Sequence, residues 1–288
     1  MSTQGTIHRY SLIIEKLERK QYPNLEELHD FLFDKGFENS RRTLQRDIKA
    51  LKEEFGVWIE LDKDKKGYYI DHELSDDFDT LVKLFELSIH AQLFGDLVKH
   101  KDTAHYIDFE NKGELHGINL LQPLLQAIKE HRYISFRHFN FHTQKTRKYT
   151  IKPYLLKEYQ GRWYIIGLIA NQKEFRTFGV DRLQELEIQT RSFKYDEDLD
   201  PKGKFRHTIG LSYSVAKPIK VVLSFTPAQG QYVKHLPLHS SQKEMIDNET
   251  EYRIELFVVP NFELMQKIWS YGPLVKVLEP ENLESLVW

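Results

Sequence analysis

The sequence contains no cysteine in its 288 residues. The chain can therefore form no disulfide, no thiolate nucleophile and no cysteine-ligated zinc site. It also lacks any run of about 18 apolar residues, so the sequence predicts no helix that spans a membrane. The first residues become amphipathic at once and show no apolar core of an export signal. We therefore expect a cytoplasmic protein.

The sequence also lacks a strong net charge, because it has 41 Lys and Arg and 43 Asp and Glu, which gives a formal net charge of -2. Any claim of nucleic-acid binding must then rest on local charge. Patterns for an acidic metal cluster, a glycine-rich phosphate loop or a nucleophile elbow are absent from the sequence. We therefore expect no enzyme, no metal and no cofactor. The length favours two or three domains of mixed α+β class.

Residues 1–75 contain three helical patterns followed by an alternating, hairpin-like segment. In the third pattern, apolar residues fall at helical spacing and predict one buried stripe, which consists of Leu44, Ile48, Leu51 and Phe55. Ser40 or Asn39 can cap the start of this helix, and Gly56 follows its end. The hairpin turn would carry three lysines at its tip.

Positive charge is concentrated on this third helix. Residues 40–52 contain five cations and a single acid, Asp47. At about 100° per residue, Arg42, Arg46 and Lys49 lie opposite the apolar stripe. A helix with a basic outer face suits insertion into the major groove and contact with phosphates. The plainer alternative is a small helical domain with a solvated basic helix.

The stretch from Ser40 to Ile70 resembles the winged helix-turn-helix of DeoR-type bacterial regulators. The resemblance rests on Ser40, Arg41, Arg42, Thr43, Arg46, Asp47, Ile48, Leu51, Gly67 and Tyr68. It implies a winged helix-turn-helix DNA-binding domain over residues 1–75. The implied DNA contacts are Ser40, Arg41, Arg42, Thr43, Gln45, Arg46, Lys49, Lys63, Lys65, Lys66 and Tyr68.

Residues 76–115 read as a helical connector. Its broad apolar stripe includes Phe78, Leu81, Val82 and Phe85. This stripe predicts either core packing against the next domain or contact with a second copy of the chain. The polar stretch from residue 101 to residue 117 is interpreted as a loop or hinge.

Residues 116–195 begin with a short helix and continue as consecutive short strands, a pattern that favours a small antiparallel barrel. Residues 131–157 contain seven Lys and Arg and no acid, interleaved with aromatic residues. Cations mixed with aromatics suit phosphates and stacked bases. An ordinary barrel with a solvated basic rim remains the alternative.

The sequence EFRTFGVDRLQEL, residues 174–186, is interpreted as one strand. Because side chains on a strand alternate between faces, Arg176, Phe178 and Arg182 would share one face. Asp181 would fall on the other face, so we expect no ion pair between Asp181 and Arg182.

This middle segment resembles the WYL domain. The resemblance rests on the run Trp163-Tyr164-Ile165, on Arg147, on Pro153-Tyr154-Leu155, and on the series from Arg176 to Arg182. It implies a central Sm/SH3-like β-barrel that senses a ligand, and for that ligand a nucleotide or oligonucleotide. The implied ligand-binding residues are Arg176, Phe178 and Arg182, with His138, Arg147 and Tyr154.

Residues 213–288 show the order βαββαβ, which predicts a ferredoxin-like domain. This segment resembles the C-terminal extension that accompanies WYL domains. The resemblance implies a part in dimerisation or in closing over the ligand site.

The leading hypothesis is therefore a sequence-specific DNA-binding transcriptional regulator, a homodimer on double-stranded DNA, controlled by an anionic ligand in the WYL domain. The alternative is an RNA or single-stranded nucleic-acid binding protein without operator-specific duplex binding. In that case the middle domain would be the main binding surface.

Overall fold

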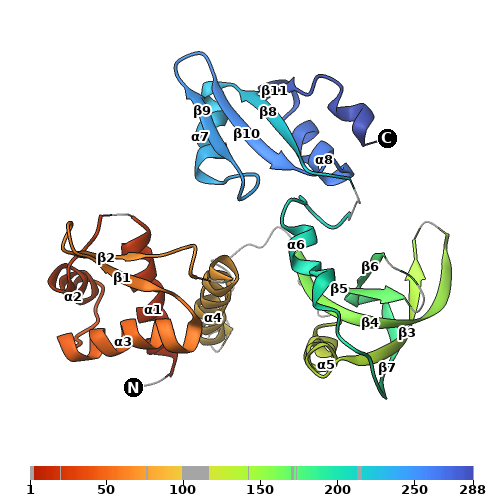
Figure 1. Ribbon diagram of the computed structural model, residues 1–288, viewed down its shortest axis with the longest axis horizontal. Helices are drawn as coiled ribbons and strands as arrows, with labels where there is room; N and C mark the ends of the chain where they lie inside the picture. Colours follow the sequence, from red (N-terminus) through yellow and green to blue (C-terminus); the bar gives the residue numbers. More distant parts are fainter. Residues whose placement is uncertain are drawn as a thin grey trace. The chain divides into compact units, whose positions relative to one another are not determined.

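The structure of the chain is a computed structural model, which describes residues 3–19, 21–75, 77–98, 117–141, 143–169, 172, 174–212 and 216–287 (Figure 1). The chain divides into two compact units, residues 1–112 and residues 113–288. Among the described residues, no helix has both the length and the apolar character that a membrane crossing requires. The four segments predicted from sequence are finer than these two units and stay a prediction.

The described residues of unit 1 form four helices and one two-stranded sheet. They are α1 (Thr3–Glu18), α2 (Leu25–Asp34), α3 (Arg41–Phe55), β1 (Ile59–Asp62), β2 (Gly67–Ile70) and α4 (Phe78–Val98). The three helical patterns and the hairpin predicted from sequence are confirmed. The core joins fully buried residues of α2 and α3, among them Leu28, Leu32, Leu44 and Leu51. The other two residues of the predicted α3 stripe, Ile48 and Phe55, pack partly buried against that core.

Local signals fix the ends of α3. The Ser40 hydroxyl accepts a hydrogen bond from the Thr43 amide at 3.2 Å, so Ser40 is the cap rather than Asn39. Gly56 ends the helix with φ of 70°, the left-handed conformation that glycine adopts without steric cost.

A buried ion pair joins α3 to α1. The Arg9 guanidinium donates to both carboxylate oxygens of Asp47, with Nη2 to Oδ1 at 3.0 Å, and both side chains are 3% exposed. Asp47 therefore points inward beside Leu44 and Leu51 instead of offsetting the cations on the outer face. No local sequence pattern points to this partner, which lies 38 residues earlier.

Helix α4 has one packed face and one exposed face. Phe78 and Phe85 are buried in the unit 1 core, whereas Leu84 is 56% exposed and Leu87 is 45% exposed. The stripe therefore packs within unit 1, and the predicted packing against the next domain and contact with a second copy both stay predictions. The stretch from residue 101, interpreted as a loop, lies outside the described residues up to residue 116.

Unit 2 begins with α5 (Ile118–Lys129) and an antiparallel sheet with strand order β6-β5-β4-β3-β7. Its strands are β3 (Arg132–Asn140), β4 (Lys145–Tyr159), β5 (Arg162–Ile169), β6 (Phe175–Gly179) and β7 (Leu183–Ser192). Neighbouring residues Ile165 and Ile166 belong to different core clusters, which shows that the sheet is covered on both faces. Helix α5 packs on the face of Ile165 (Figure 1).

The stretch predicted as one strand, residues 174–186, is in fact broken. A 3-10 turn, η2 (Val180–Arg182), separates β6 from β7, and these two strands lie at opposite edges of the sheet. A flat sheet would hold its edges about 19 Å apart, whereas a 3-10 turn advances only about 2 Å per residue. The sheet must therefore curl strongly. In the described part of the chain no pairing joins β6 to β7, so a closed barrel is not observed.

The C-terminal part of unit 2 follows the predicted element order. After η3 (Glu197–Leu199) and α6 (Pro201–Phe205), which sequence analysis did not predict, come β8 (Ile219–Phe225), α7 (Pro227–His235), β9 (Lys243–Asp247), β10 (Tyr252–Val258), α8 (Phe262–Ser270), η4 (Gly272–Leu274) and β11 (Val275–Glu279). The strand order is β11-β8-β10-β9. The last predicted helix is a 3-10 turn, η5 (Leu283–Leu286).

The buried ion pair gives a first prediction. Asp47→Asn would leave the Arg9 charge buried without its counter-ion, at a cost of about 3–5 kcal/mol in the stability of unit 1. Hydrogen-exchange protection of the amides in α1 and α3 measures this loss. Glu53→Gln, which removes an exposed acid from the same helix, is the matched control, and we expect a change below about 1 kcal/mol. Equal losses in the two variants would contradict the structural role of Asp47.

Candidate nucleic-acid interface and effector site

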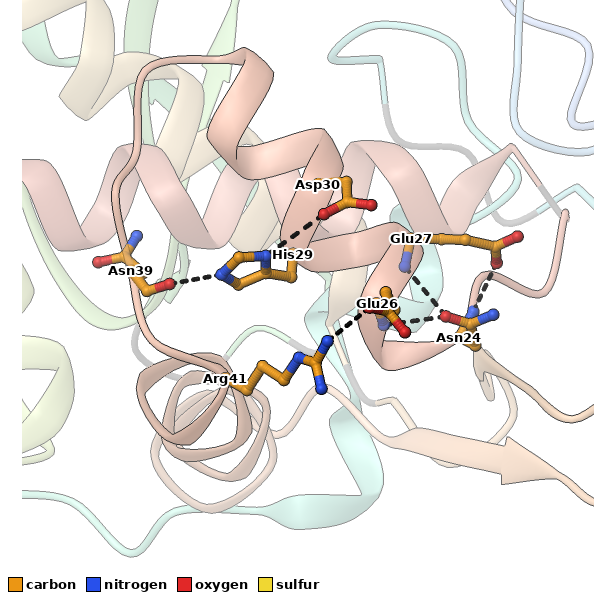
Figure 2. A network of polar contacts seen from close by, with 7 residues as sticks. All are labelled: Asn24, Glu26, Glu27, His29, Asp30, Asn39 and Arg41. Atoms are coloured by element: carbon orange, nitrogen blue, oxygen red, sulfur yellow. Dashed lines mark hydrogen bonds and ion pairs between the residues drawn. The ribbon is translucent and has the colours of Figure 1, made fainter.

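A polar network joins α2 to the start of α3 (Figure 2). Asn24 caps α2 by accepting hydrogen bonds from the Glu26 and Glu27 amides at 2.9 and 3.0 Å. Glu26 in turn accepts a hydrogen bond from Arg41, the first residue of α3. His29 on α2 reaches the turn between the helices, where its Nε2 atom lies 2.7 Å from the Asn39 carbonyl oxygen. These contacts fix the angle at which α3 leaves α2.

The predicted DNA contacts on the outer face of α3 fall into two groups, those paired with an acid and those without such a partner among the described residues. Arg41 is paired with Glu26, and Lys49 Nζ lies 3.6 Å from Glu53 Oε1. Arg42 and Arg46 are exposed, and no ion pair joins either of them to another described residue. Because Asp47 is turned inward and bound to Arg9, it does not pair with either of these two exposed guanidinium groups.

The remaining predicted residues on α3 divide between capping and exposure. Ser40 and Thr43 serve the cap, and their hydroxyl oxygens are 3.0 Å apart. Gln45 is exposed. The structure thus offers Gln45, Arg42 and Arg46 to a partner, while Ser40 and Thr43 hold the helix start.

The hairpin of β1 and β2 is anchored to the loop before α2. The Tyr68 amide donates to the Pro23 carbonyl at 2.8 Å, and a Cβ on Gly67 would collide with the Tyr22 carbonyl oxygen at 1.6 Å. Lys65 Nζ lies 3.5 Å from the centre of the Tyr22 ring, and a hydrogen bond to Tyr22 raises the pKa of Lys65.

The four predicted wing residues therefore differ in how freely they can meet DNA. Lys63 and Lys66 stand exposed at the hairpin tip, between the two strands. Lys65 is exposed but engaged with Tyr22. Tyr68 is half-buried and packs against the unit 1 core.

A second candidate site lies where η2 meets β3. His138 is 7% exposed, and its ring centroid lies 5.3 Å from that of Phe178 and 6.4 Å from that of Tyr149. Its Nε2 atom is buried and has no hydrogen-bond partner in the described part of the chain. Burial, and then the nearby Arg182 guanidinium, lower the pKa of His138 to about 4, so the ring is neutral at pH 7.

Arg182 lies at the same corner. Its guanidinium carbon is 4.6 Å from the centre of the Phe141 ring, and a quarter of the side chain is exposed. Its Nε atom lies 3.5 Å from Asp181 Oδ1 without hydrogen-bond geometry, so this buried nitrogen also has no hydrogen-bond partner among the described residues. Gly179 makes room for the Arg182 guanidinium, because a Cβ at position 179 would lie 2.6 Å from Arg182 Nη2.

The expectation that Asp181 and Arg182 would lie on opposite faces was wrong. Asp181 Oδ1 lies 3.5 Å from Arg182 Nε, and Asp181 Oδ2 lies 3.5 Å from Arg162 Nη1. The physical reason is η2, because the strand period of two stops at Gly179 and a 3-10 turn rotates about 120° per residue.

Of the other predicted ligand residues, only Arg147 lies near this corner. It is the register partner of His138 across β3 and β4, and it is exposed. Tyr154 is buried in the other core cluster, with Ile166. It lines a cavity of about 790 Å³ with Lys152 and Lys194, on the opposite face of the sheet.

Arg176 and Phe178 lie two residues apart on β6 and share one face, as predicted, but they differ in burial. Phe178 is 4% exposed and pairs with Ile165, whereas Arg176 is exposed and pairs with Gly167, farther from η2 along β6. The structure therefore brings His138, Phe178 and Arg182 together with Arg147 beside them. Tyr154 lies on the opposite face of the sheet, and Arg176 lies on the Phe178 face but two residues farther from η2. Sequence analysis did not single out Gly179. This glycine could have indicated the break between β6 and β7, since a glycine inside a strand pattern often marks a bend.

The buried imidazole predicts a pH dependence of stability. Because the folded pKa of about 4 lies below the unfolded value near 6.5, the unfolded chain binds more protons between these values. Stability should therefore fall as pH drops from about 6.5 to about 4, by about 3 kcal/mol for this residue. Urea unfolding of the native chain and of His138→Gln across this range measures the difference. A constant difference between the two proteins would refute the assignment.

Residues 119–188 match the family model of the WYL domain, and residues 217–288 match that of the WCX domain. A search of the curated proteins finds no match to this chain.

Solved structures that are similar to the chain include the following two. One is the proteasome accessory factor B/C (PafBC) of Arthrobacter aurescens, with 20% identity and a TM-score of 0.34 over 99% of this chain. The chain spans 46% of the length of that protein. The other is a CRISPR Cas-related protein, with 13% identity and a TM-score of 0.40 over 98% of this chain and 82% of that one. The family matches thus identify a WYL domain within residues 119–188 of the chain and a WCX domain within residues 217–288.

Proposed function

We propose that the chain is a DNA-binding transcriptional regulator whose activity is controlled by an anionic ligand in the WYL domain. The observation that carries the proposal is the outer face of α3. Arg42 and Arg46 are exposed there, whereas Asp47 of the same helix is buried against Arg9. The resemblance of residues 40–70 to winged helix-turn-helix regulators supports it, as does the match to the WYL domain.

In the proposed complex α3 lies in the major groove. Arg42, Arg46 and Gln45 face base edges and the nearest phosphates, since arginine and glutamine can read guanine and adenine through paired hydrogen bonds. Lys63 and Lys66 at the hairpin tip contact the adjacent backbone. A homodimer would read two half-sites separated by about one helical turn or a multiple of it.

In unit 2 we propose that His138, Arg147 and Arg182 receive the negative charge of the effector beside the Phe178 ring. A nucleotide or oligonucleotide is the class that the resemblance to ligand-sensing WYL domains implies. The support from geometry is the pair of buried, unpartnered nitrogens at the η2 corner. We propose binding rather than catalysis at both sites.

Charge reversal on α3 tests the first half of the proposal. Arg42→Glu with Arg46→Glu should abolish binding to an operator-bearing duplex, because two phosphate or base contacts become repulsive. In the single alanine variants, the slope of log affinity against log salt should fall by about one for each lost phosphate contact. Fluorescence anisotropy over a salt series measures both effects.

Arg19→Glu is the matched control, because Arg19 is an exposed, paired arginine near the end of α1. It should bind duplex like the native chain. If the α3 variants bind duplex normally while single-stranded RNA or DNA binding depends on unit 2, the alternative function holds instead.

Single arginine substitutions in unit 2 test the second half. Arg182→Ala should lower affinity for a 5′-phosphorylated dinucleotide about tenfold or more, because a charge-assisted hydrogen bond contributes about 1.5–3 kcal/mol. Arg176→Ala should have a smaller effect, since Arg176 lies three residues before the end of β6 and pairs with Gly167, whereas Phe178 next to His138 pairs with Ile165. Isothermal titration and mass spectrometry of co-purified ligands measure this, with Arg191→Ala as the control. Loss of binding in Arg176→Ala alone would move the site to the other end of β6.

A further inference from the structure

Two unpartnered nitrogens lie at the η2 corner. Buried polar atoms in proteins are nearly always hydrogen-bonded, and exceptions call for an explanation. Four buried side-chain atoms in the described part of the chain have no partner, and two of them, His138 Nε2 and Arg182 Nε, belong to neighbouring side chains. His138 is more than nine-tenths buried. Its unpartnered atom points to a ligand that is bound only part of the time.

The groups around His138 limit what that ligand can be. Arg182 supplies permanent positive charge, and Arg147 adds a second guanidinium at the register position across β4. Asp181 is the one nearby acid among the described residues that affects the ring, and its carboxylate already lies 3.5 Å from Arg182 and Arg162. The groups that face the ring from the packed elements are Phe178 on β6, Leu183 on β7, Arg147 and Tyr149 on β4, and Asp181 and Arg182 on η2.

Arg182 can only donate hydrogen bonds, so the ligand atom beside its Nε must be an acceptor. The neutral imidazole is held neutral partly by the Arg182 charge. An oxyanion placed between the two side chains would offset that charge and favour the protonated ring. Both ring nitrogens of the protonated form are donors, so Nε2 and Nε could then share one acceptor group.

We infer that His138 takes up one proton from solvent when an oxyanion binds beside Arg182, so that effector binding is coupled to pH. This inference rests on the proposed effector site and names the group recognised there, an acceptor-only oxyanion rather than a base edge. A phosphate group and a carboxylate share this chemistry. The Arg182 side chain is long and partly exposed, so it can move to admit a ligand. Its contacts with the Phe141 ring and the Asp181 carboxylate are the ones that such a movement would change.

Binding of sulfate to the full chain tests the inference, because sulfate keeps its charge throughout the range from about pH 7.5 to about pH 5.5. We expect affinity to rise as pH falls, approaching about tenfold for each pH unit, the value for uptake of one proton. Isothermal titration in buffers of different ionisation enthalpy measures the proton uptake directly. Acetate, and a dinucleotide with and without its 5′-phosphate, distinguish a carboxylate from a phosphate source.

The variants separate this inference from the proposed function. His138→Gln keeps a hydrogen-bond donor but cannot take up a proton, so its affinity should be independent of pH. Arg182→Gln should lose binding at every pH. Binding that needs Arg182 but is flat in pH, or a slope that persists in His138→Gln, would overturn the proton uptake and leave the effector site standing. Sulfate binding that is absent, or unaffected by Arg182→Gln, would overturn both. Thermal unfolding of each variant at each pH confirms that it is folded.

Discussion

The short connection from β6 to β7 is the constraint on which the effector site depends. Three residues join the two edge strands of a five-stranded sheet, so the sheet has to curl until its edges approach each other. In the ladders, Gly179 is opposite Tyr164 on β5, and Leu183 is opposite His138 on β3. The turn thus crosses from the β5 side of the sheet to the β3 side, and it carries Arg182 to a histidine that sequence order alone does not bring near it.

Sequence reasoning succeeded where the signals are local. The start and end of α3, the α3 stripe and the hairpin follow from capping residues, helical spacing and alternation, each of which acts within a few residues. It failed where one local rule was extended too far. Alternation was carried through Gly179, and that error placed Asp181 on the wrong face and grouped Arg176 with Arg182. The face of Tyr154 could not be read from alternation, because the register of β4 shifts between Pro153 and Leu155.

The charge of α3 shows the limit set by long-range contacts. The sequence correctly shows the excess of cations, but it cannot tell which acid offsets them. Asp47 is neutralised by Arg9 from another helix, whereas Arg41 and Lys49 are each paired with an exposed acid. Exposed pairs contribute little to stability and exchange readily for a phosphate, so Arg41 remains available to DNA. A buried pair does not exchange, so Asp47 never competes with DNA for Arg42 or Arg46.

The two units use an arginine in opposite ways. In unit 1 both oxygens of Asp47 receive hydrogen bonds from Arg9, so the charge is fully satisfied and the contact fixes one arrangement of the helices. In unit 2 the guanidinium of Arg182 lies beside a neutral imidazole, and a nitrogen of each remains unpaired. The second arrangement sacrifices stability in the free protein, and an oxyanion would recover it on binding. Such a difference between free and bound states is what a ligand needs in order to shift a conformational equilibrium.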